Sequence, residues 1–247
     1  MINRCKVFTP RKYVLDLLDK ANYNNNLYGK KVLENSCGEG NVLVEIVRRY
    51  IISCKKQHIS IGEIKNGLER DIVGVEIDEE CILQCKKNLD NVAISLGVIN
   101  VNWNIIHANY LHLKLSEKFS YILGNPPYIM YREISKAEKK FIRNNYAVCK
   151  KGKFDYYYAF IEKSLMELKS DGKLVYIIPN SVYKNVYANE VRDLMKPYLR
   201  EIYDYTIEKK FPGITTSSNI IVLGENDKAN FVYVDVLKKE KGNICKK

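Results

Sequence analysis

Val32-Leu33-Glu34-Asn35-Ser36-Cys37-Gly38-Glu39-Gly40-Asn41 is the stretch of sequence from which the fold can be argued. Residues 31–35 predict a short strand, and two glycines follow it, where the backbone can turn sharply and approach a ligand closely. Apolar residues then recur at helical spacing, at Val42, Leu43, Ile46, Val47, Tyr50 and Ile51. The pattern indicates a strand, a glycine turn and a helix N-terminus, which is a common place for a ligand.

A second predicted strand, residues 72–77, adds an acidic group to this picture. It reads Val73-Gly74-Val75-Glu76-Ile77-Asp78, so Glu76 stands at the end of the strand. A carboxylate there can accept both hydroxyls of a ribose. The chain has no full G-x-G-x-x-G, and Glu76 lies 36 residues beyond Gly40 rather than about 20. These features favour a ligand that bears adenosine but no pyrophosphate.

The rest of the chain continues the alternation of strands and helices. The apolar periodicity predicts helices over about 79–96, over 160–168 with an end near Asp171-Gly172, and over 186–197, and strands near 103–106, 121–123, 173–178, 202–207, 219–223 and 231–236. This order favours an α/β fold with a largely parallel sheet and helices on both faces. No repeat, linker or boundary is visible, so residues 1–247 are expected to form a single domain.

Composition excludes several classes of protein. The 247 residues are 46% apolar, which is enough for a real core. The longest apolar run, Tyr156 to Ile161, is far shorter than the roughly 20 residues of a membrane span, and no secretory signal is visible. The seven cysteines are scattered without a Cys-x-x-Cys, and the three histidines form no ligand pattern. We therefore expect a cytoplasmic protein with reduced thiols and no metal.

The positive charge is concentrated in two segments. The chain has 40 basic and 29 acidic residues, net +11. Residues 132–153 have a net charge of +6, and residues 236–247 have +4. The second segment can be a solvated tail, but the first predicts a polyanion partner. Its basic residues, which we expect to contact phosphates, are Arg132, Lys136, Lys139, Lys140, Arg143, Lys150, Lys151 and Lys153.

The tetrapeptide Asn125-Pro126-Pro127-Tyr128 follows the predicted strand at 121–123. Two prolines fix the backbone, so that the Asn125 side chain and the Pro126 carbonyl are held rigidly. An amide oxygen and a backbone carbonyl are two acceptors, which suit a planar amine with two hydrogens. This segment therefore predicts a site that binds an exocyclic or amide NH₂ group.

From Phe8-Thr9-Pro10 to about Leu223, the sequence resembles the S-adenosylmethionine-dependent N6-adenine DNA methyltransferases of restriction-modification systems, those with an N-terminal cofactor region. The segments that carry the resemblance are the loop from Glu34 to Gly40, the acidic Glu76, Asn125 to Tyr128, Asp155-Tyr156-Tyr157-Tyr158-Ala159-Phe160-Ile161-Glu162, Ile177-Ile178-Pro179-Asn180-Ser181 and Phe211-Pro212-Gly213. The resemblance implies a Rossmann-like class I methyltransferase fold with a mostly parallel seven-stranded sheet. It implies S-adenosylmethionine as cofactor.

The resemblance also implies roles for single residues. Asn125, Pro126, Pro127 and Tyr128 would be catalytic, and Tyr128 and Phe211 would stack on the target base. Asn109 stands where the family generally has an aspartate that accepts from the cofactor's adenine amine, and Asn35 replaces a proline. The residues expected to bind the cofactor are Phe8, Thr9, Pro10, Glu34, Ser36, Cys37, Gly38, Gly40, Glu76, Ile77, Asn109 and Tyr110.

The expected function is methyl transfer from S-adenosylmethionine to N6 of an adenine flipped out of duplex DNA, as the modification enzyme of a restriction-modification system. Methylation of RNA adenines, methylation of a release-factor glutamine and a non-catalytic nucleic-acid-binding subunit stay open as alternatives. Residues 1–30 are expected to contact the cofactor. Residues 224–247 are expected to form a basic tail, which can be the start of a target-recognition domain. Otherwise specificity is expected to come from a separate domain or subunit or from short loops.

Overall fold

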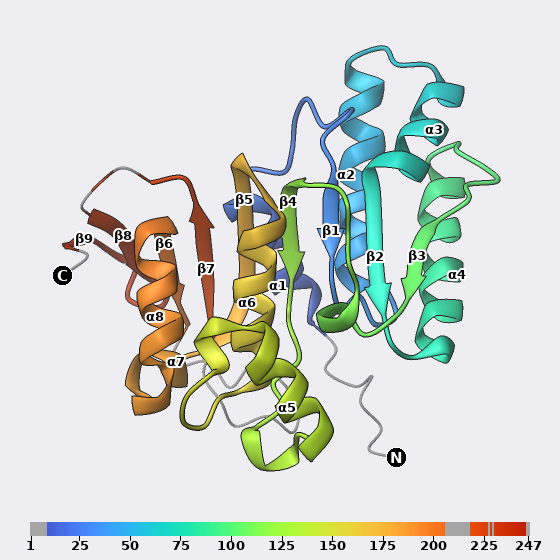
Figure 1. Ribbon diagram of the computed structural model, residues 1–247. Coiled ribbons are helices and arrows are strands. Elements are labelled where there is room, and N and C mark those ends of the chain that lie inside the picture. The colour runs from blue at the N-terminus through green and yellow to red at the C-terminus, as the bar shows by residue number, and fades with distance from the viewer. Residues whose placement is uncertain (1–8, 206–217, 227, 229, 246–247) are drawn as a thin grey trace. The chain divides into compact units, whose positions relative to one another are not determined.

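The computed structural model describes residues 9–205, 218–226, 228 and 230–245. The chain forms two compact units, which we call unit 1 (Met1–Gly124) and unit 2 (Asn125–Lys247). Each unit carries its own strands and helices (Figure 1). No helix in the described ranges is long and apolar enough to cross a membrane. Within the same ranges, no three His, Cys, Asp or Glu side chains are grouped to hold a metal ion.

Unit 1 is built on four parallel strands in the order β3-β2-β1-β4. Leu33 is in register with Val73 on one side and with Ile122 on the other. The elements are α1 (Arg11–Lys20), β1 (Val32–Glu34), α2 (Asn41–Lys56), α3 (Ile61–Asp71), β2 (Ile72–Glu76), α4 (Glu79–Ser95), β3 (Asn104–His107), η1 (Tyr110–His112) and β4 (Phe119–Gly124). The strands predicted at 31–35, 72–77, 103–106 and 121–123 are thus present.

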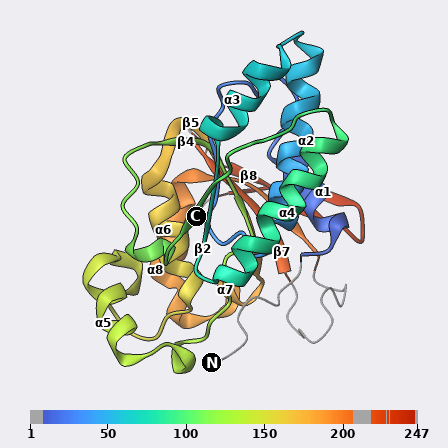
Figure 2. The ribbon, with the colours of Figure 1, turned by 90° about the vertical axis from the view of Figure 1, so that its right-hand side faces the viewer.

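The helices of unit 1 form where the sequence provides a buried stripe and a cap. In α2, the predicted apolar stripe from Val42 to Ile51 is buried. Asp78 caps α4 by accepting from the Cys81 N–H at 3.1 Å. The helices α2 and α4 pack beside each other (Figure 2). The helix α3, which the apolar periodicity did not predict, begins with a capping box between Ser60 and Glu63.

Unit 2 contains five strands in the order β5-β7-β6-β8-β9, with β7 antiparallel to both β5 and β6, β8 parallel to β6, and β9 antiparallel to β8. Its helices precede β5 or connect β5 to β6. The elements are η2 (Tyr131–Glu133), α5 (Lys136–Asn145), η3 (Ala147–Cys149), α6 (Tyr156–Glu167), β5 (Leu168–Pro179), α7 (Ser181–Lys184), η4 (Val186–Ala188), α8 (Asn189–Met195), η5 (Lys196–Tyr198), β6 (Leu199–Asp204), β7 (Ser218–Gly224), β8 (Asn230–Asp235) and β9 (Glu240–Cys245).

The strand count corrects the expected fold class in its detail. The described residues contain nine strands rather than seven, and those of unit 2 are mixed rather than mostly parallel. β7, which is antiparallel to both β5 and β6, makes the strands of unit 2 mixed, and a hairpin in the segment expected to be a basic tail adds to the strand count. There the Asp235 side chain accepts from the backbone N–H groups of Leu237 and Lys238, at 3.1 and 3.0 Å, which closes a turn between β8 and β9.

A second correction concerns the end of α6. The apolar stripe predicted a helix that includes Leu168 and ends near Asp171-Gly172. In the structure α6 ends at Glu167, and Leu168 is the first residue of β5. Apolar residues at this junction satisfy both periodicities, so spacing alone does not fix the boundary. The helical prediction over residues 186–197 is met by η4, α8 and the beginning of η5.

Candidate functional site

The glycine loop of unit 1 connects β1 to α2 and is shaped by two left-handed glycines. Gly38 has φ +52°, and Gly40, which caps α2, has φ +84°. A Cβ on Gly40 would lie 2.6 Å from the Sγ atom of Cys85 in α4, whereas one on Gly38 would meet no atom within 4 Å. Gly40 is therefore required by both backbone conformation and packing, while Gly38 is required by conformation alone.

Glu76 holds this loop to the end of β2. Its Oε2 atom accepts from the backbone N–H of Gly38 at 2.8 Å. Its Oε1 atom accepts from the N–H groups of Ile77 and Asp78, at 2.8 and 3.1 Å. A carboxylate has about four acceptor positions, so three bonds leave room for a further donor at Oε2. The predicted ribose-binding carboxylate thus also fixes the loop beside it.

Glu34 is a buried carboxyl group at the end of β1. The residue is 3% exposed, and its Oε2 atom has no hydrogen-bond partner among the described residues. Burial raises the pKa of Glu34 well above its ordinary value, although a backbone hydrogen bond from Leu43 opposes the shift. A buried carboxyl oxygen that lacks a donor is costly, and it suits a cationic group of a ligand.

The other residues expected to bind a cofactor are in different environments. Ile77 is 55% exposed, so it offers an apolar surface directly after Glu76. The Asn109 Oδ1 atom accepts from the Leu111 N–H at 3.0 Å and caps η1, so a donor from a cofactor would have to share that oxygen. Tyr110 is buried in the core. The expected contacts of Asn109 and Tyr110 with a cofactor therefore stay predictions.

The N-terminal segment is described only from Thr9 onward. Thr9 is buried, and the Pro10 carbonyl accepts from the N–H groups of Tyr13 and Val14 at the start of α1. Phe8, which was predicted to bind the cofactor, lies outside the described residues. So does Phe211, which was predicted to stack on the target base.

The tetrapeptide from Asn125 to Tyr128 opens unit 2 and follows the last residue of β4 in the chain. Pro126 and the Oδ1 atom of Asn125 are buried. The Tyr128 hydroxyl donates to the backbone carbonyl of Ile177 in β5, at 2.8 Å. Burial raises the pKa of Tyr128 above its ordinary value, so the phenol stays a neutral donor.

The ring of Tyr128 has a second contact. It packs edge-to-face against Tyr157 in α6, with the ring centroids 5.9 Å apart and the planes at 70°. Tyr128 as a whole residue is half-buried. The sequence singled out the segments that contain Tyr157 and Ile177, but not these contacts with Tyr128.

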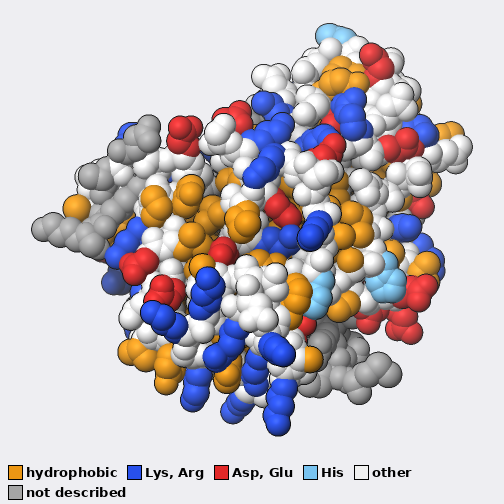
Figure 3. Space-filling model, viewed as in Figure 1, with side chains coloured by type: hydrophobic (Ala, Val, Ile, Leu, Met, Phe, Trp, Pro, Cys, Tyr) orange, Lys and Arg blue, Asp and Glu red, His pale blue; other side chains and the backbone are white. Residues whose placement is uncertain are grey.

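The basic segment divides into two groups of cations. Six of the eight, Arg132, Lys136, Lys140, Lys150, Lys151 and Lys153, are exposed. Lys139 and Arg143 are half-buried over the Tyr131 ring, with the Lys139 Nζ atom 4.4 Å from its centroid, and an Arg143 Nη2–H donates to the Tyr131 hydroxyl at 2.9 Å. Lys and Arg side chains gather at the end of unit 2 that carries α5 (Figure 3). The exposed six are therefore the better candidates for phosphate contacts.

The chain is similar in sequence and in fold to known methyltransferases. The modification methylase CviBIII of Paramecium bursaria Chlorella virus NC1A is 27% identical over 234 residues, which are 93% of this chain and 52% of that protein. Among solved structures, a Listeria monocytogenes protein described as a class I S-adenosylmethionine-dependent methyltransferase matches with a TM-score of 0.64 at 17% identity, over 95% of this chain and 67% of that one. The restriction-modification enzyme LlaGI, solved with a DNA substrate mimic, matches with a TM-score of 0.72 at 16% identity, over 96% and 26%.

These matches confirm the kind of fold that the resemblance implied, and the chain spans about half the length of the Chlorella virus methylase. Residues 43–211, more than half of the chain, match the family described as Eco57I restriction-modification methylase. That range contains most of the glycine loop's helix, Glu76 and the whole tetrapeptide from Asn125 to Tyr128. The chain therefore belongs to the Eco57I restriction-modification methylase family.

Proposed function

We propose that this chain transfers a methyl group from S-adenosylmethionine to N6 of an adenine in duplex DNA, as the modification enzyme of a restriction-modification system. The observation that carries the proposal is the tetrapeptide from Asn125 to Tyr128. Its amide oxygen is buried and its tyrosine ring is fixed by β5 and α6. Family membership supports methyl transfer, and the two acceptors support an amine as the group that receives it.

The residues of unit 1 fit the proposed cofactor. Glu76 keeps room for a ribose hydroxyl, Ile77 offers an exposed apolar side chain for an adenine ring, and Glu34 has a buried oxygen for a cationic group. S-adenosylmethionine would supply a methyl group already activated by its sulfonium. The protein then needs no general base with a tuned pKa to begin the reaction.

The acceptors of unit 2 would prepare the adenine amine. The N6 lone pair is delocalised into the ring, so the amine is a poor nucleophile. The Asn125 Oδ1 atom and the Pro126 carbonyl would each accept one N6 hydrogen, which favours a pyramidal nitrogen with its lone pair available. Both contacts strengthen as positive charge develops on nitrogen, so they stabilise the transition state more than the ground state. The N–CH₃ bond would form as the S–CH₃ bond breaks, which leaves a neutral thioether, and the surplus proton on N6 would then pass to solvent.

An adenine inside a duplex could not reach these acceptors, so the base must leave the helix. The Tyr128 ring would receive it by stacking, which offsets part of the unstacking cost of a few kcal/mol. Because the hydroxyl is already hydrogen-bonded and the ring already packs against Tyr157, Tyr128 would lose little conformational freedom on binding. The six exposed cations of the basic segment would bind the flanking phosphates, and the LlaGI complex shows a similar fold with a DNA mimic.

Labelled methyl transfer tests the proposal directly. The protein is incubated with S-adenosylmethionine that carries a labelled methyl group, and with duplex DNA, structured RNA or a release-factor protein in parallel. Label in DNA that is recovered as N6-methyladenine after hydrolysis is the expected result. Label recovered as a methylated cytosine, or found only in RNA or protein, would overturn the proposed substrate. Cofactor binding without transfer to any of the three would indicate a non-catalytic subunit.

A further inference from the structure

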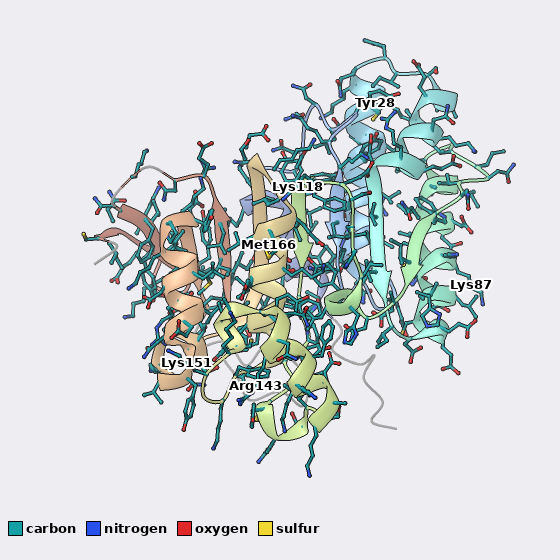
Figure 4. All side chains as sticks on the ribbon, in the orientation of Figure 1. Tyr28, Lys87, Lys118, Arg143, Lys151 and Met166 are labelled. Carbon is teal, nitrogen blue, oxygen red and sulfur yellow. The ribbon has the colours of Figure 1, made fainter. Side chains whose placement is uncertain are left out.

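Two loops of unit 2 present exposed side chains from rigid supports. The first contains Lys150-Lys151-Gly152-Lys153, between η3 and α6. An Arg143 Nη2–H donates to the Gly152 carbonyl at 2.8 Å, and the Arg143 guanidinium lies over the rings of Tyr131 and Phe154, at 5.7 and 5.9 Å from their centroids. Three exposed lysines therefore extend from a loop whose backbone is fastened to α5 (Figure 4 labels Arg143 and Lys151).

The second loop is the turn that contains α7 and η4, and Arg192 holds its backbone. An Arg192 Nη1–H group from α8 donates to the carbonyls of Val182 and Asn185, at 2.6 and 2.8 Å. The Asn185 Oδ1 atom accepts from the Tyr187 N–H at 3.0 Å. With its backbone fixed in this way, the turn leaves Val186 70% and Tyr187 46% exposed. Neither side chain is needed to bury the core, so both are available for contact with a ligand.

The two loops touch each other through Tyr187. Gly152 has φ +65°, and a Cβ on it would lie 3.3 Å from the Cδ1 atom of the Tyr187 ring. The Nζ atom of Lys153 is 5.7 Å from the centroid of that ring. We call the combined area the Tyr187 surface, which consists of Lys150, Lys151, Lys153, Lys184, Val186 and Tyr187. Its members are exposed, and Lys and Arg side chains predominate at this end of unit 2 (Figure 3).

We propose that the Tyr187 surface adds a base contact to the phosphate contacts of the basic segment: its lysines, three of which belong to that segment, bind phosphates, and Tyr187 stacks on an unpaired base. Aromatic rings set among basic side chains bind bases that have lost their neighbours, because every base has a stacking face while the cations hold the backbone. The two arginine supports would keep the ordering cost of binding low. The inference rests on the function proposed above.

The surface lies on segments that adjoin, in the chain, the two elements that hold Tyr128. Ile177, whose carbonyl accepts from the Tyr128 hydroxyl, precedes the start of α7 by four residues on the strand that leads into it. Tyr157, which packs against the Tyr128 ring, belongs to the helix that follows the lysine loop. A duplex opened at one adenine offers unstacked bases next to the flipped nucleotide and opposite it. Such a base is the ligand that the Tyr187 surface would take.

The test compares DNA binding and methyl transfer by the wild-type chain with those of Tyr187→Ala and Tyr187→Phe. The probe is a short duplex that carries one mismatched adenine. Tyr187→Ala is expected to weaken binding by about tenfold and to raise KM for DNA by a similar factor, because one stacked base contributes roughly 1–3 kcal/mol. Both kcat and cofactor affinity should stay as in the wild type, and Tyr187→Phe should bind like the wild type.

Three further variants separate stacking from charge and from loss of fold. Tyr198→Ala removes a comparably exposed tyrosine outside the surface, at 39% exposure, and should have no effect. Val186→Asp alters a side chain that is 70% exposed, so it should fold normally yet weaken binding. Lys150→Ala with Lys151→Ala should reduce the slope of log affinity against log salt by about two, whereas Tyr187→Ala should leave that slope unchanged.

The outcomes distinguish this inference from the function on which it rests. If the wild type methylates DNA and Tyr187→Ala and Val186→Asp bind it as well as the wild type, the Tyr187 surface is not a DNA contact. If the loss appears with RNA and not with DNA, the inference is also wrong. If the wild type neither binds nor methylates DNA, the proposed function fails first.

Discussion

The glycine loop of unit 1 and the tetrapeptide of unit 2 are both candidate binding segments, yet they are held in different ways. In the loop, Glu76 accepts three backbone N–H groups within unit 1, and Gly40 is fitted against Cys85. In the tetrapeptide, two prolines restrict the backbone, and Tyr128 is tied to Ile177 and Tyr157 by its side chain. One segment is fixed by hydrogen bonds to its backbone, and the other by its covalent structure and one side chain.

This difference indicates a division of labour. In unit 1 the groups that would bind a cofactor also shape the loop, so a substitution there should change affinity and local stability together. In unit 2 the acceptors of Asn125 and Pro126 are separate from the contacts that fix Tyr128. A substitution at Asn125 should therefore change the chemical step with little effect on either the fold or the cofactor.

Asn125→Ala gives the largest expected effect. Loss of the amide acceptor should abolish methyl transfer, with a decrease in kcat of at least about 100-fold, because an acceptor that acts on developing charge is removed. Cofactor affinity, measured by calorimetry, should stay nearly the same. Asn144→Ala, which alters an exposed asparagine of α5, is the matched control. Substantial activity in Asn125→Ala would refute the role of this amide, and loss of cofactor binding would refute the division of labour.

Glu76→Gln probes the other side of the comparison. The amide keeps the shape of the carboxylate but presents a donor where at least one backbone N–H now points, and it loses the charge that strengthens three hydrogen bonds. We expect cofactor affinity to fall by roughly 10- to 100-fold, since hydrogen bonds to charged groups contribute about 1.5–3 kcal/mol. Glu39→Gln removes the same charge from an exposed position in the loop and should bind the cofactor normally. Equal affinities for these two variants would contradict the assignment of Glu76.

The sequence was most informative where function depends on local geometry. The strand before Gly38, the acidic end of the strand at Glu76 and the tetrapeptide at Asn125 were all found from residue type and spacing, and the structure has strands ending where they were expected. Such features involve residues close together in the chain, and glycine and proline report directly on backbone conformation.

What the sequence missed depends on residues far apart in the chain. The Tyr128 hydroxyl reaches a carbonyl 49 residues away, and the support from Arg192 depends on how α8 packs against the turn before it. The β8–β9 hairpin was obscured by its lysines, because all six residues of β9 are exposed and no apolar alternation marks the strand. Arg143 was grouped with the phosphate-binding cations, and charge alone does not show that its Nη2 donors bind within the protein.

Glu34 allows the role of unit 1 to be tested through pH. Burial raises its pKa, so the carboxyl group holds its proton above the ordinary value of about 4.3 for glutamate. A cationic group of the ligand near the Glu34 Oε2 atom would favour the carboxylate and lower the pKa of Glu34. Binding would therefore release up to about one proton. Cofactor affinity should therefore rise with pH, by up to about tenfold per pH unit, until the raised pKa is passed.

Calorimetry in two buffers with different ionisation enthalpies counts the released protons. Glu34→Gln should release none and should lose the pH dependence. The same substitution should also make the ligand-free protein more resistant to heat at neutral pH, because a raised carboxyl pKa means that stability is lost as the pH rises through it. Proton release that persists in Glu34→Gln would place the titrating group elsewhere.

Tyr128→Phe sharpens the comparison from the side of unit 2 and has the smallest expected effect. The ring and its contact with Tyr157 are kept, while the Ile177 carbonyl loses a donor. A neutral hydrogen bond contributes about 0.5–1.5 kcal/mol, so we expect methyl transfer to fall by about two- to tenfold, measured as kcat/KM for DNA. Tyr128→Ala, which also removes the stacking face, should lose considerably more.

The size of the Tyr128→Phe effect decides what the hydroxyl does. A hydroxyl that only orients the ring gives a small loss that does not depend on pH near neutrality, because burial keeps this phenol protonated. A loss as large as that of Asn125→Ala would mean that the hydroxyl takes part in the chemical step, and the separation between fixing and reacting groups in unit 2 would fail. Tyr198→Phe, at an exposed position, supplies the baseline. If Tyr128→Phe matches that baseline, the prolines and the Tyr157 contact are sufficient to hold the ring.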